Sequence, residues 1–260
     1  MMNQEYMEYA ERLRNESTSR VRATIKSLDP EPKDVILILA GGDNARWNGV
    51  KKYNLDVNGE PVLSRTLRLC KEFRPDAEIR VIGPEVKGKS HQDVFLKVYN
   101  MWSRMGNTYL MFGDVSWMKG TLRKFLSEKP TEPKLYGRPH GNKITRREDM
   151  ELFGGVVPFV WKNFMWKVHW DALSIAPSGD WWSVAELMIY DEKTRNKLTV
   201  LPQRLRDWTW YHVMRKRGEF FKSRFFVDVG ESVTDDFDYP QDYPKYCEWC
   251  GPMIDREDPP

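Results

Sequence analysis

A glycine-rich loop followed by two basic side chains is the clearest chemical feature of this chain. Residues 39–63 read LAGGDNARWNGVKKYNLDVNGEPVL. Gly41 and Gly42 let the backbone approach a ligand closely, and the amide groups of such a loop can cradle phosphate oxygens. Arg46 and Lys52 add positive charge, which a reacting phosphorus centre needs more than it needs covalent help. The stretch therefore predicts a binding site for the phosphates of a nucleotide.

A single carboxylate is expected beside that loop. Asp114 directly follows the apolar stretch YLMFG, so a buried strand would deliver it to the strand's carboxyl end. Mg²⁺ takes oxygen ligands and keeps several waters, so one or two carboxylates and the phosphates complete its shell. We expect Asp114 to hold such a cation, Mg²⁺ or Mn²⁺. The alternative is an aspartate that caps the next turn.

Strands and helices alternate around these two features. The expected strands cover 35–40, 78–83 and 108–113, and the expected helices cover 61–73, 91–105 and 119–127. Alternation of this kind implies right-handed crossovers and an α/β fold with a mainly parallel sheet between helices. Ligands of such sheets bind beyond the carboxyl ends of the strands, where Gly41 and Asp114 would lie.

The chain is expected to fold as one domain between two short extensions. The expected parts are an N-terminal helix and linker (1–33), the domain (34–246) with its nucleotide half (34–128), acceptor half (129–224) and closing acidic segment (225–246), and a C-terminal tail (247–260). The acceptor half contains short strands and turns over 134–160, a helix over 181–190 and a strand over 198–202.

Composition argues against several classes of protein. The formal net charge of +3 over 260 residues is too mild to indicate nucleic-acid binding by itself. No stretch approaches the roughly 20 apolar residues of a membrane span, and the N-terminus lacks the apolar core of a signal peptide. Three cysteines do not make a disulfide framework. We therefore expect a cytoplasmic protein without membrane contact, while the oligomeric state is left open.

The glycine-rich loop resembles the signature of sugar nucleotidyltransferases with the GT-A-like fold, and its spacing is similar to that of the molybdenum-cofactor guanylyltransferase branch. The resemblance implies a three-layer α/β/α architecture with a smaller β-containing acceptor subregion. It also implies that Arg46 is the signature arginine and that Lys52, not Lys51, grips the triphosphate. Trp47 and Asn48 stand where Met and Gly are usual. The implied backbone contacts to base and phosphates come from Leu39, Ala40, Gly41 and Gly42.

The acidic stretch near the C-terminus resembles the box that closes this fold. Residues 238–243 read DYPQDY, similar to the D-T-P-E-D-L of the family. The resemblance makes Asp238 the preferred second metal ligand, and Asp228 competes because it too would end a strand. Asp235 and Asp236 are expected to face solvent or to cap a helix. Crowded acids favour a cation because like charges repel, and an acidic turn without a metal is the alternative.

The acceptor half offers weaker candidates. Arg138 begins the basic stretch RPHGNKITRR, which suits an acceptor's phosphate, and Glu151 could hold sugar hydroxyls or act as a base. By resemblance, Gly155 belongs to a strand that faces the sugar pocket, and Trp181 could form a stacking wall over a sugar. For each of these residues, core packing or a solvated surface is the alternative role.

Two transfer reactions fit these residues. The leading hypothesis is a Mg²⁺-dependent nucleotidyltransferase that moves NMP from an NTP to a phosphorylated sugar or related acceptor. The alternative is a glycosyltransferase of the same fold that uses a nucleotide sugar, with a polyanionic acceptor such as nucleic acid, which the basic stretches and 11 tryptophans would suit. The glycine-rich loop and the acidic stretch near the C-terminus together resemble a group of phage and actinobacterial proteins. That group is intermediate between nucleotidyltransferases and glycosyltransferases. A module that only binds sugar nucleotides is the third hypothesis.

Overall fold

The architecture is that of a computed structural model. It describes residues 33–41, 47–86, 88, 91–139, 151–166, 222, 224–230, 232–236 and 240–257. The expected N-terminal helix, the expected helix over 181–190 and the expected strand over 198–202 lie outside the described residues.

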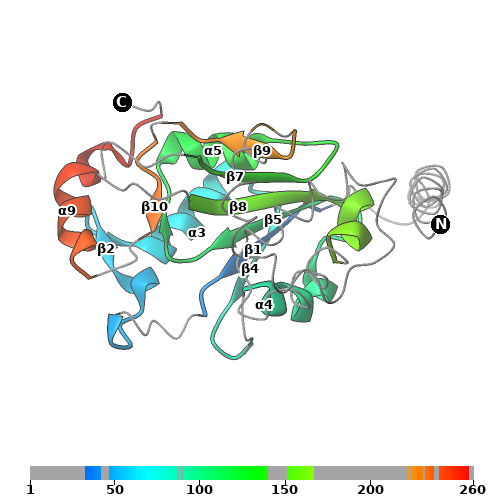
Figure 1. Ribbon diagram of the computed structural model, residues 1–260, viewed down its shortest axis with the longest axis horizontal. Coiled ribbons are helices and arrows are strands. Elements are labelled where there is room, and N and C mark those ends of the chain that lie inside the picture. The colour runs from blue at the N-terminus through cyan, green and yellow to red at the C-terminus, as the bar shows by residue number, and fades with distance from the viewer. Residues whose placement is uncertain are drawn as a thin grey trace, which may run out of the picture.

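A six-stranded sheet in the order β4-β1-β5-β8-β7-β9 forms the centre of the molecule (Figure 1). Its strands are β1 (Val35–Leu39), β4 (Glu78–Ile82), β5 (Asn107–Phe112), β7 (Lys134–Arg138), β8 (Glu151–Pro158) and β9 (Phe226–Asp228). β8 runs antiparallel to both of its neighbours, and the other three pairings are parallel. Five strands therefore share one direction, which confirms the expected mainly parallel α/β sheet.

Helices cover both faces of this sheet (Figure 1). Tyr109 of β5 contacts Phe125 of α5 (Lys119–Ser127) with ring centroids 5.7 Å apart, and α5 packs beside α3 (Val62–Phe73). Phe112 of β5 contacts Phe95 of α4 (His91–Lys97) at 6.4 Å. Tyr109 and Phe112 lie three positions apart, so their side chains leave the strand on opposite faces. The result is the expected three-layer arrangement.

Burial explains why the first strand was predictable. All five residues of β1 are at most 8% exposed, as a central parallel strand covered on both faces requires. The two long helices α3 and α5 also lie where their patterns predicted. The helix expected over 91–105 ends earlier: α4 stops at Lys97, and a 3-10 helix, η4 (Tyr99–Met101), follows. Trp102 ends that turn with extended backbone and a ring that is 2% exposed, so core packing overrides helical propensity.

A second, smaller core lies beyond one end of the sheet. It gathers Trp47, Val57, Val62, Met118, Val233, Tyr246, Cys250 and Ile254. The elements around it are η3 (Lys52–Asn54), β2 (Asp56–Val57), β3 (Glu60–Pro61), β6 (Val115–Ser116), β10 (Asp235–Asp236), α9 (Asp242–Trp249) and η6 (Gly251–Met253). The segment after residue 246, which we expected as a tail, packs into this core.

Trp47, from the turn after the glycine-rich loop, is a buried part of this second core. Its indole is 6% exposed and meets the ring of Tyr243 edge-on, with centroids 6.3 Å apart. The indole of Trp47 therefore packs in the second core.

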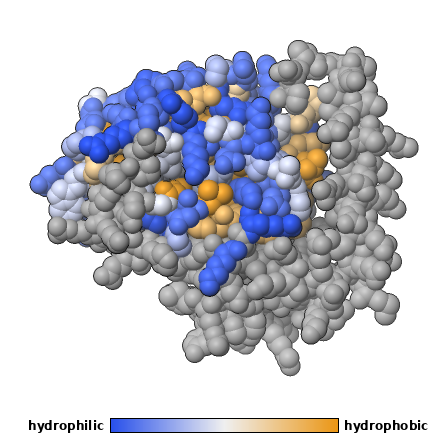
Figure 2. All heavy atoms as spheres, turned by 90° about the horizontal axis from the view of Figure 1, so that it is seen from above, coloured by the Kyte–Doolittle hydropathy of each residue, from blue (hydrophilic) through white to orange (hydrophobic). Residues whose placement is uncertain are grey.

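No described helix is long and apolar enough to cross a membrane. The face drawn in Figure 2 is mostly hydrophilic over the described atoms, with apolar side chains exposed only in small groups.

Gly154 in β8 provides a test of the packing between sheet and helices. A Cβ at this position would lie 2.6 Å from the carbonyl oxygen of Leu110, with the ring of Phe125 on the same side. We expect Gly154→Ala to lower the free energy of unfolding by about 1–3 kcal/mol, because the strand must shift. Urea denaturation followed by circular dichroism measures this. The exposed variant Val160→Ala should stay within about 0.5 kcal/mol, and equal stability of both variants would contradict the tight packing.

Candidate active site

The carboxyl ends of β4, β1 and β5 converge on one place. The amide of Ala40, just after β1, donates to the carbonyl of Ile82 at 2.8 Å, and the amide of Gly113, just after β5, donates to the carbonyl of Leu39 at 2.7 Å. A Cβ on Gly113 would lie only 2.9 Å from that carbonyl oxygen. Glycine is therefore needed at 113 for the two loops to approach each other, a role that the sequence did not reveal.

A pocket opens at these strand ends. Its walls consist of Leu39, Ala40, Gly41, Tyr53, Ile82, Gly83, Val86, Val94, Phe112 and Asp114. The walls are mainly apolar, with one phenol ring and one carboxylate, which suits the flat ring of a nucleoside base with a polar end. Three of the four residues expected to contact the nucleotide through their backbone lie here. The fourth, Gly42, and the signature arginine, Arg46, lie outside the described residues.

Lys52 and Asp114, predicted from two separate motifs, meet beside this pocket. The ammonium of Lys52 lies 2.7 Å from the Oδ2 atom of Asp114. The two side chains are 13% and 30% exposed, so the pair is shielded from water but still accessible to a ligand. Lys51 is the residue before η3, and Lys52 is its first residue. The structure therefore brings Lys52, rather than its neighbour, to the carboxylate.

A tight turn positions η3 and its lysine. Asn48 and Gly49 have φ values of 49° and 82°, and the amide of Val50 donates to the carbonyl of Trp47 at 2.9 Å. Asparagine is one of the few residues that adopt this left-handed conformation readily. Asn48 can therefore occupy this position without a glycine, while the buried ring of Trp47 anchors the turn in the second core.

A group of three carboxylates lies next to the strand end that bears Asp114. The carboxylate oxygens of Glu151, Asp235 and Asp236 lie within 4.8 Å of one another. β10 pairs antiparallel with β6, which places Asp236 opposite Val115, the residue after Asp114. The closing acidic segment thus returns to the loop of Asp114. The expectation that Asp235 faces solvent is wrong, because the residue is 1% exposed.

Arg138 compensates much of the charge of this group. Its guanidinium pairs with Glu151, lies 3.8 Å from Asp235, and donates to the carbonyls of Ser232 and Thr234 at 3.2 and 3.3 Å. Arg138 is 3% exposed. Its partners in the structure are thus inside the fold, and a direct contact with an acceptor stays a prediction for both Arg138 and Glu151.

Asp228 lies apart from the other acids. It ends β9 as expected, is exposed, and accepts a hydrogen bond from the amide of Gly230 at 2.8 Å. β8 and β7 separate β9 from β5, so the strand of Asp228 is roughly 14 Å from the strand leading to Asp114. One cation with ligand distances of about 2.1 Å does not span that gap. Asp238, the preferred second ligand, lies outside the described residues.

The remaining acceptor candidates are only partly visible. Gly155 is buried in the middle of β8, opposite Leu110 and Leu135 of the neighbouring strands. Because successive residues face opposite sides of a sheet, Gly155 faces away from the α5 side that Gly154 faces. Its contact with a sugar stays a prediction, and Trp181 lies outside the described residues.

No family model matches the sequence, and no curated protein sequence matches it either. Solved structures with a similar course of the chain include the inositol-1-phosphate CTP transferase from T. maritima, at 14% identity and a TM-score of 0.46, covering 87% of this chain and 98% of that one. HddC from Yersinia pseudotuberculosis in complex with GMP-PN is another, at 14% identity and a TM-score of 0.45, covering 83% of this chain and 99% of that one. At this distance the chemistry has to be inferred from the side chains.

Proposed function

We propose that this protein is a nucleotidyltransferase that moves NMP from an NTP to a phosphorylated sugar or a related acceptor. The observation that carries the proposal is the Lys52–Asp114 ion pair beside an apolar pocket at the ends of three parallel strands. The mainly apolar walls of the pocket suit a base, and the pair offers one cation for phosphates and one carboxylate for a metal.

The reaction that fits this arrangement is a displacement at phosphorus. A phosphate oxygen of the acceptor attacks the α-phosphorus of the NTP, a new phosphorus–oxygen bond forms, and the bond to the bridging oxygen breaks. Pyrophosphate leaves with the electron pair of that bond. Lys52 lies where it would neutralise charge on the phosphates, which supplies much of the catalysis in such reactions.

The carboxylates present fit a divalent cation. Oxygen ligands suit Mg²⁺, and Glu151, Asp235 and Asp236 bring three carboxylates together in one place. A bound Mg²⁺ would neutralise charge on the attacked α-phosphate and on the leaving pyrophosphate, which consists of the β and γ phosphates. The β6–β10 pairing places Asp236 opposite Val115, the residue after Asp114, and we propose that Asp114 and Asp236 would hold the ion.

Ligand binding would separate the ion pair seen here. The ammonium of Lys52 would turn from the carboxylate to a phosphate oxygen, which leaves Asp114 available as a metal ligand. Both groups exchange one charged partner for another, so neither is left buried and uncompensated. The pair is therefore a resting arrangement that suits a protein awaiting a metal–nucleotide complex.

Transfer of a sugar from a nucleotide sugar is the second candidate reaction. The pocket and the ion pair would serve the diphosphate of such a donor as well as a triphosphate. The basic stretches on which a nucleic-acid acceptor depends, residues 138–147 and 215–224, lie almost wholly outside the described residues.

A thermal-shift comparison of donors tests the proposal. With Mg²⁺ and an NTP at about 100 times its dissociation constant, we expect the melting temperature to rise by about 5–10 °C. Asp114→Asn should reduce that shift without lowering the melting temperature of the free protein by more than a few degrees. A shift with nucleotide sugars and none with any NTP would favour glycosyl transfer, and no shift with either would overturn the proposal.

A further inference from the structure

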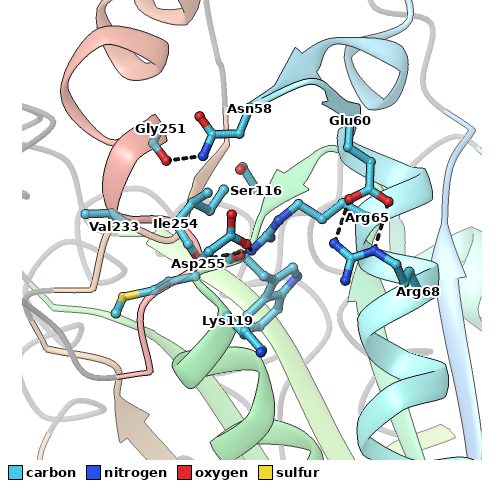
Figure 3. Close-up of polar contacts among 12 residues, drawn as sticks. Asn58, Glu60, Arg65, Arg68, Ser116, Lys119, Val233, Gly251, Ile254 and Asp255 are labelled. Atoms are coloured by element: carbon cyan, nitrogen blue, oxygen red, sulfur yellow. Dashed lines mark hydrogen bonds and ion pairs between the residues drawn. The ribbon is translucent and has the colours of Figure 1, made fainter.

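Arg65 joins two parts of the candidate site through three hydrogen bonds. It lies on α3 and is 2% exposed. Its guanidinium donates to the carbonyl of Trp117 at 2.6 Å, to the carbonyl of Ile254 at 2.9 Å, and to the carboxylate of Asp255 at 2.7 Å. Figure 3 shows the side chain of Arg65 extending from α3 toward Asp255 in the C-terminal segment. Trp117 follows Asp114 by three positions, so the contacts link the chain's last residues to the loop of Asp114.

The charge of Asp255 is stabilised in this arrangement. Burial alone would raise the pKa of its carboxyl, but the hydrogen bond and positive charge of Arg65 outweigh that effect and hold the pKa below its usual value. The carboxylate is 57% exposed, so solvent weakens the ion pair. The two contacts from the guanidinium to carbonyl oxygens are buried, and they make the firmer link.

The same C-terminal residues cap the helix that follows Asp114. The amide of Lys119 donates to the carbonyl of Ile254 at 2.8 Å, and the amide of Gly120 donates to the carbonyl of Arg256 at 3.0 Å. The first amides of a helix have no partner within it, and α5 has no side-chain cap. A Cβ on Gly120 would lie 1.5 Å from the carbonyl oxygen of Glu257, so only glycine admits the segment there.

The C-terminal segment also holds the loop that carries Lys52. The side-chain amide of Asn58 donates to the carbonyl of Gly251 at 2.7 Å, and the hydroxyl of Tyr243 donates to the carbonyl of Asp56 at 2.5 Å. Asp56 and Asn58 belong to the hairpin of β2 and β3, which begins directly after η3. Figure 3 shows the Asn58–Gly251 contact next to the Arg65–Asp255 contact.

We propose that residues 242–257 act as a brace for the nucleotide site and that Arg65 is its main positioning residue. The inference rests on the proposed function. Lys52 and Asp114 come from different loops, and the brace contacts both: through Asn58 on one side, and through Arg65 and the start of α5 on the other. It keeps the two charged groups at ion-pair distance, and hence at the spacing at which they receive a metal and a phosphate. A misplacement of about 1 Å is enough to reduce a transfer rate about 100-fold.

Hydrogen exchange of the Arg65→Met variant tests the brace without any ligand. The amides of Asn54 and Leu55 donate to the carbonyls of Lys51 and Lys52, so they report on the lysine loop, which Arg65 does not bond directly. We expect their exchange to accelerate at least about tenfold, together with that of residues 113–117, while β1 and β4 are unchanged. Acceleration confined to residues 117–120 and 250–257 would mean that Arg65 is only a local structural residue and would overturn the proposal.

Matched variants separate the brace from general instability. Arg68→Met removes a guanidinium one turn along the same helix. Arg68 forms an ion pair with Glu60 at the surface, so this variant should leave the hydrogen exchange of the Lys52 loop and of the Asp114 loop unchanged. Arg65→Lys should restore part of the protection. Asn58→Gly keeps the positive φ of 57° accessible and removes the contacts of the amide side chain to Gly251 and Asp255, both of which belong to the brace. If Arg65→Met does not fold, Asn58→Gly takes its place. Unchanged hydrogen exchange at Asn54 and Leu55 in the Asn58→Gly variant would then overturn the proposal.

The dissociation constant of an NTP with Mg²⁺, measured by calorimetry well below the melting temperature, distinguishes failure of the brace from failure of the proposed function. We expect Arg65→Met to bind at least about tenfold more weakly than the wild type. Unchanged affinity and unchanged exchange would refute the brace and leave the proposed function intact. If hydrogen exchange accelerates in Arg65→Met but the wild-type protein binds no nucleotide, the brace is supported and the proposed nucleotidyltransferase function is refuted.

Discussion

Replacing Lys52 by methionine is expected to lower the rate of pyrophosphate release about 10²–10³-fold, with little change in melting temperature. The rate falls because the ammonium is the one described cation placed beside both the pocket and Asp114, and loss of one such preorganised charge has an effect of this size. Stability changes little because Asp114 is 30% exposed and remains solvated when its partner is removed. Initial rates with saturating NTP, Mg²⁺ and acceptor measure the first effect, and differential scanning fluorimetry the second.

Lys51→Met is the matched control for that variant. Lys51 has a side chain of the same length and charge as Lys52, but it precedes η3. The rate of pyrophosphate release by Lys51→Met should therefore stay within a few-fold of the wild-type rate. A wild-type rate in Lys52→Met together with a large loss in Lys51→Met would show that the wrong lysine has been assigned.

Replacing Arg138 by methionine is expected to lower the free energy of unfolding by about 3–5 kcal/mol. Arg138, Glu151 and Asp235 are all nearly inaccessible to water, with side chains that are 4%, 10% and 2% exposed. Removing the guanidinium takes a positive charge away from carboxylates that stay buried and close together, which is the costly way to break a buried ion pair. Denaturation by urea, analysed with a fixed m-value, measures the loss.

Arg68→Met controls for loss of an arginine as such. The Arg68 side chain is 52% exposed and pairs with Glu60 at the surface, so its removal should cost about 0–1 kcal/mol. If Arg138→Met proved as stable as Arg68→Met, the carboxylate group would have to be compensated by other means than this guanidinium.

Local patterns predicted the nucleotide half of the fold well. The strand at 35–39, the helices at 62–73 and 119–127, and the delivery of Asp114 by a buried strand all follow from apolar runs or periodicity within a few neighbouring residues. The pairing of Lys52 with Asp114 could also be anticipated, because both belong to motifs at the carboxyl ends of adjacent parallel strands.

Long-range contacts are what the sequence did not reveal. Asp235 was expected at the surface, but Arg138, nearly a hundred positions earlier, makes its burial tolerable, and no local pattern joins the two. Val86 and Val94 line the pocket without belonging to any motif. The attachment of the C-terminal segment depends on backbone carbonyls that meet Arg65 and α5, and no pattern of side chains along the sequence reveals such contacts.

The products formed from an NTP test the central claim most directly. Purified protein would be incubated with each of the four NTPs, Mg²⁺ and a panel of sugar phosphates, and the products resolved by ³¹P nuclear magnetic resonance. We predict pyrophosphate together with a nucleotide sugar containing a new α-phosphorus–phosphate linkage, both lost in Lys52→Met. Release of a nucleoside diphosphate from a nucleotide sugar, with no pyrophosphate from any NTP, would contradict the assignment and identify glycosyl transfer as the reaction.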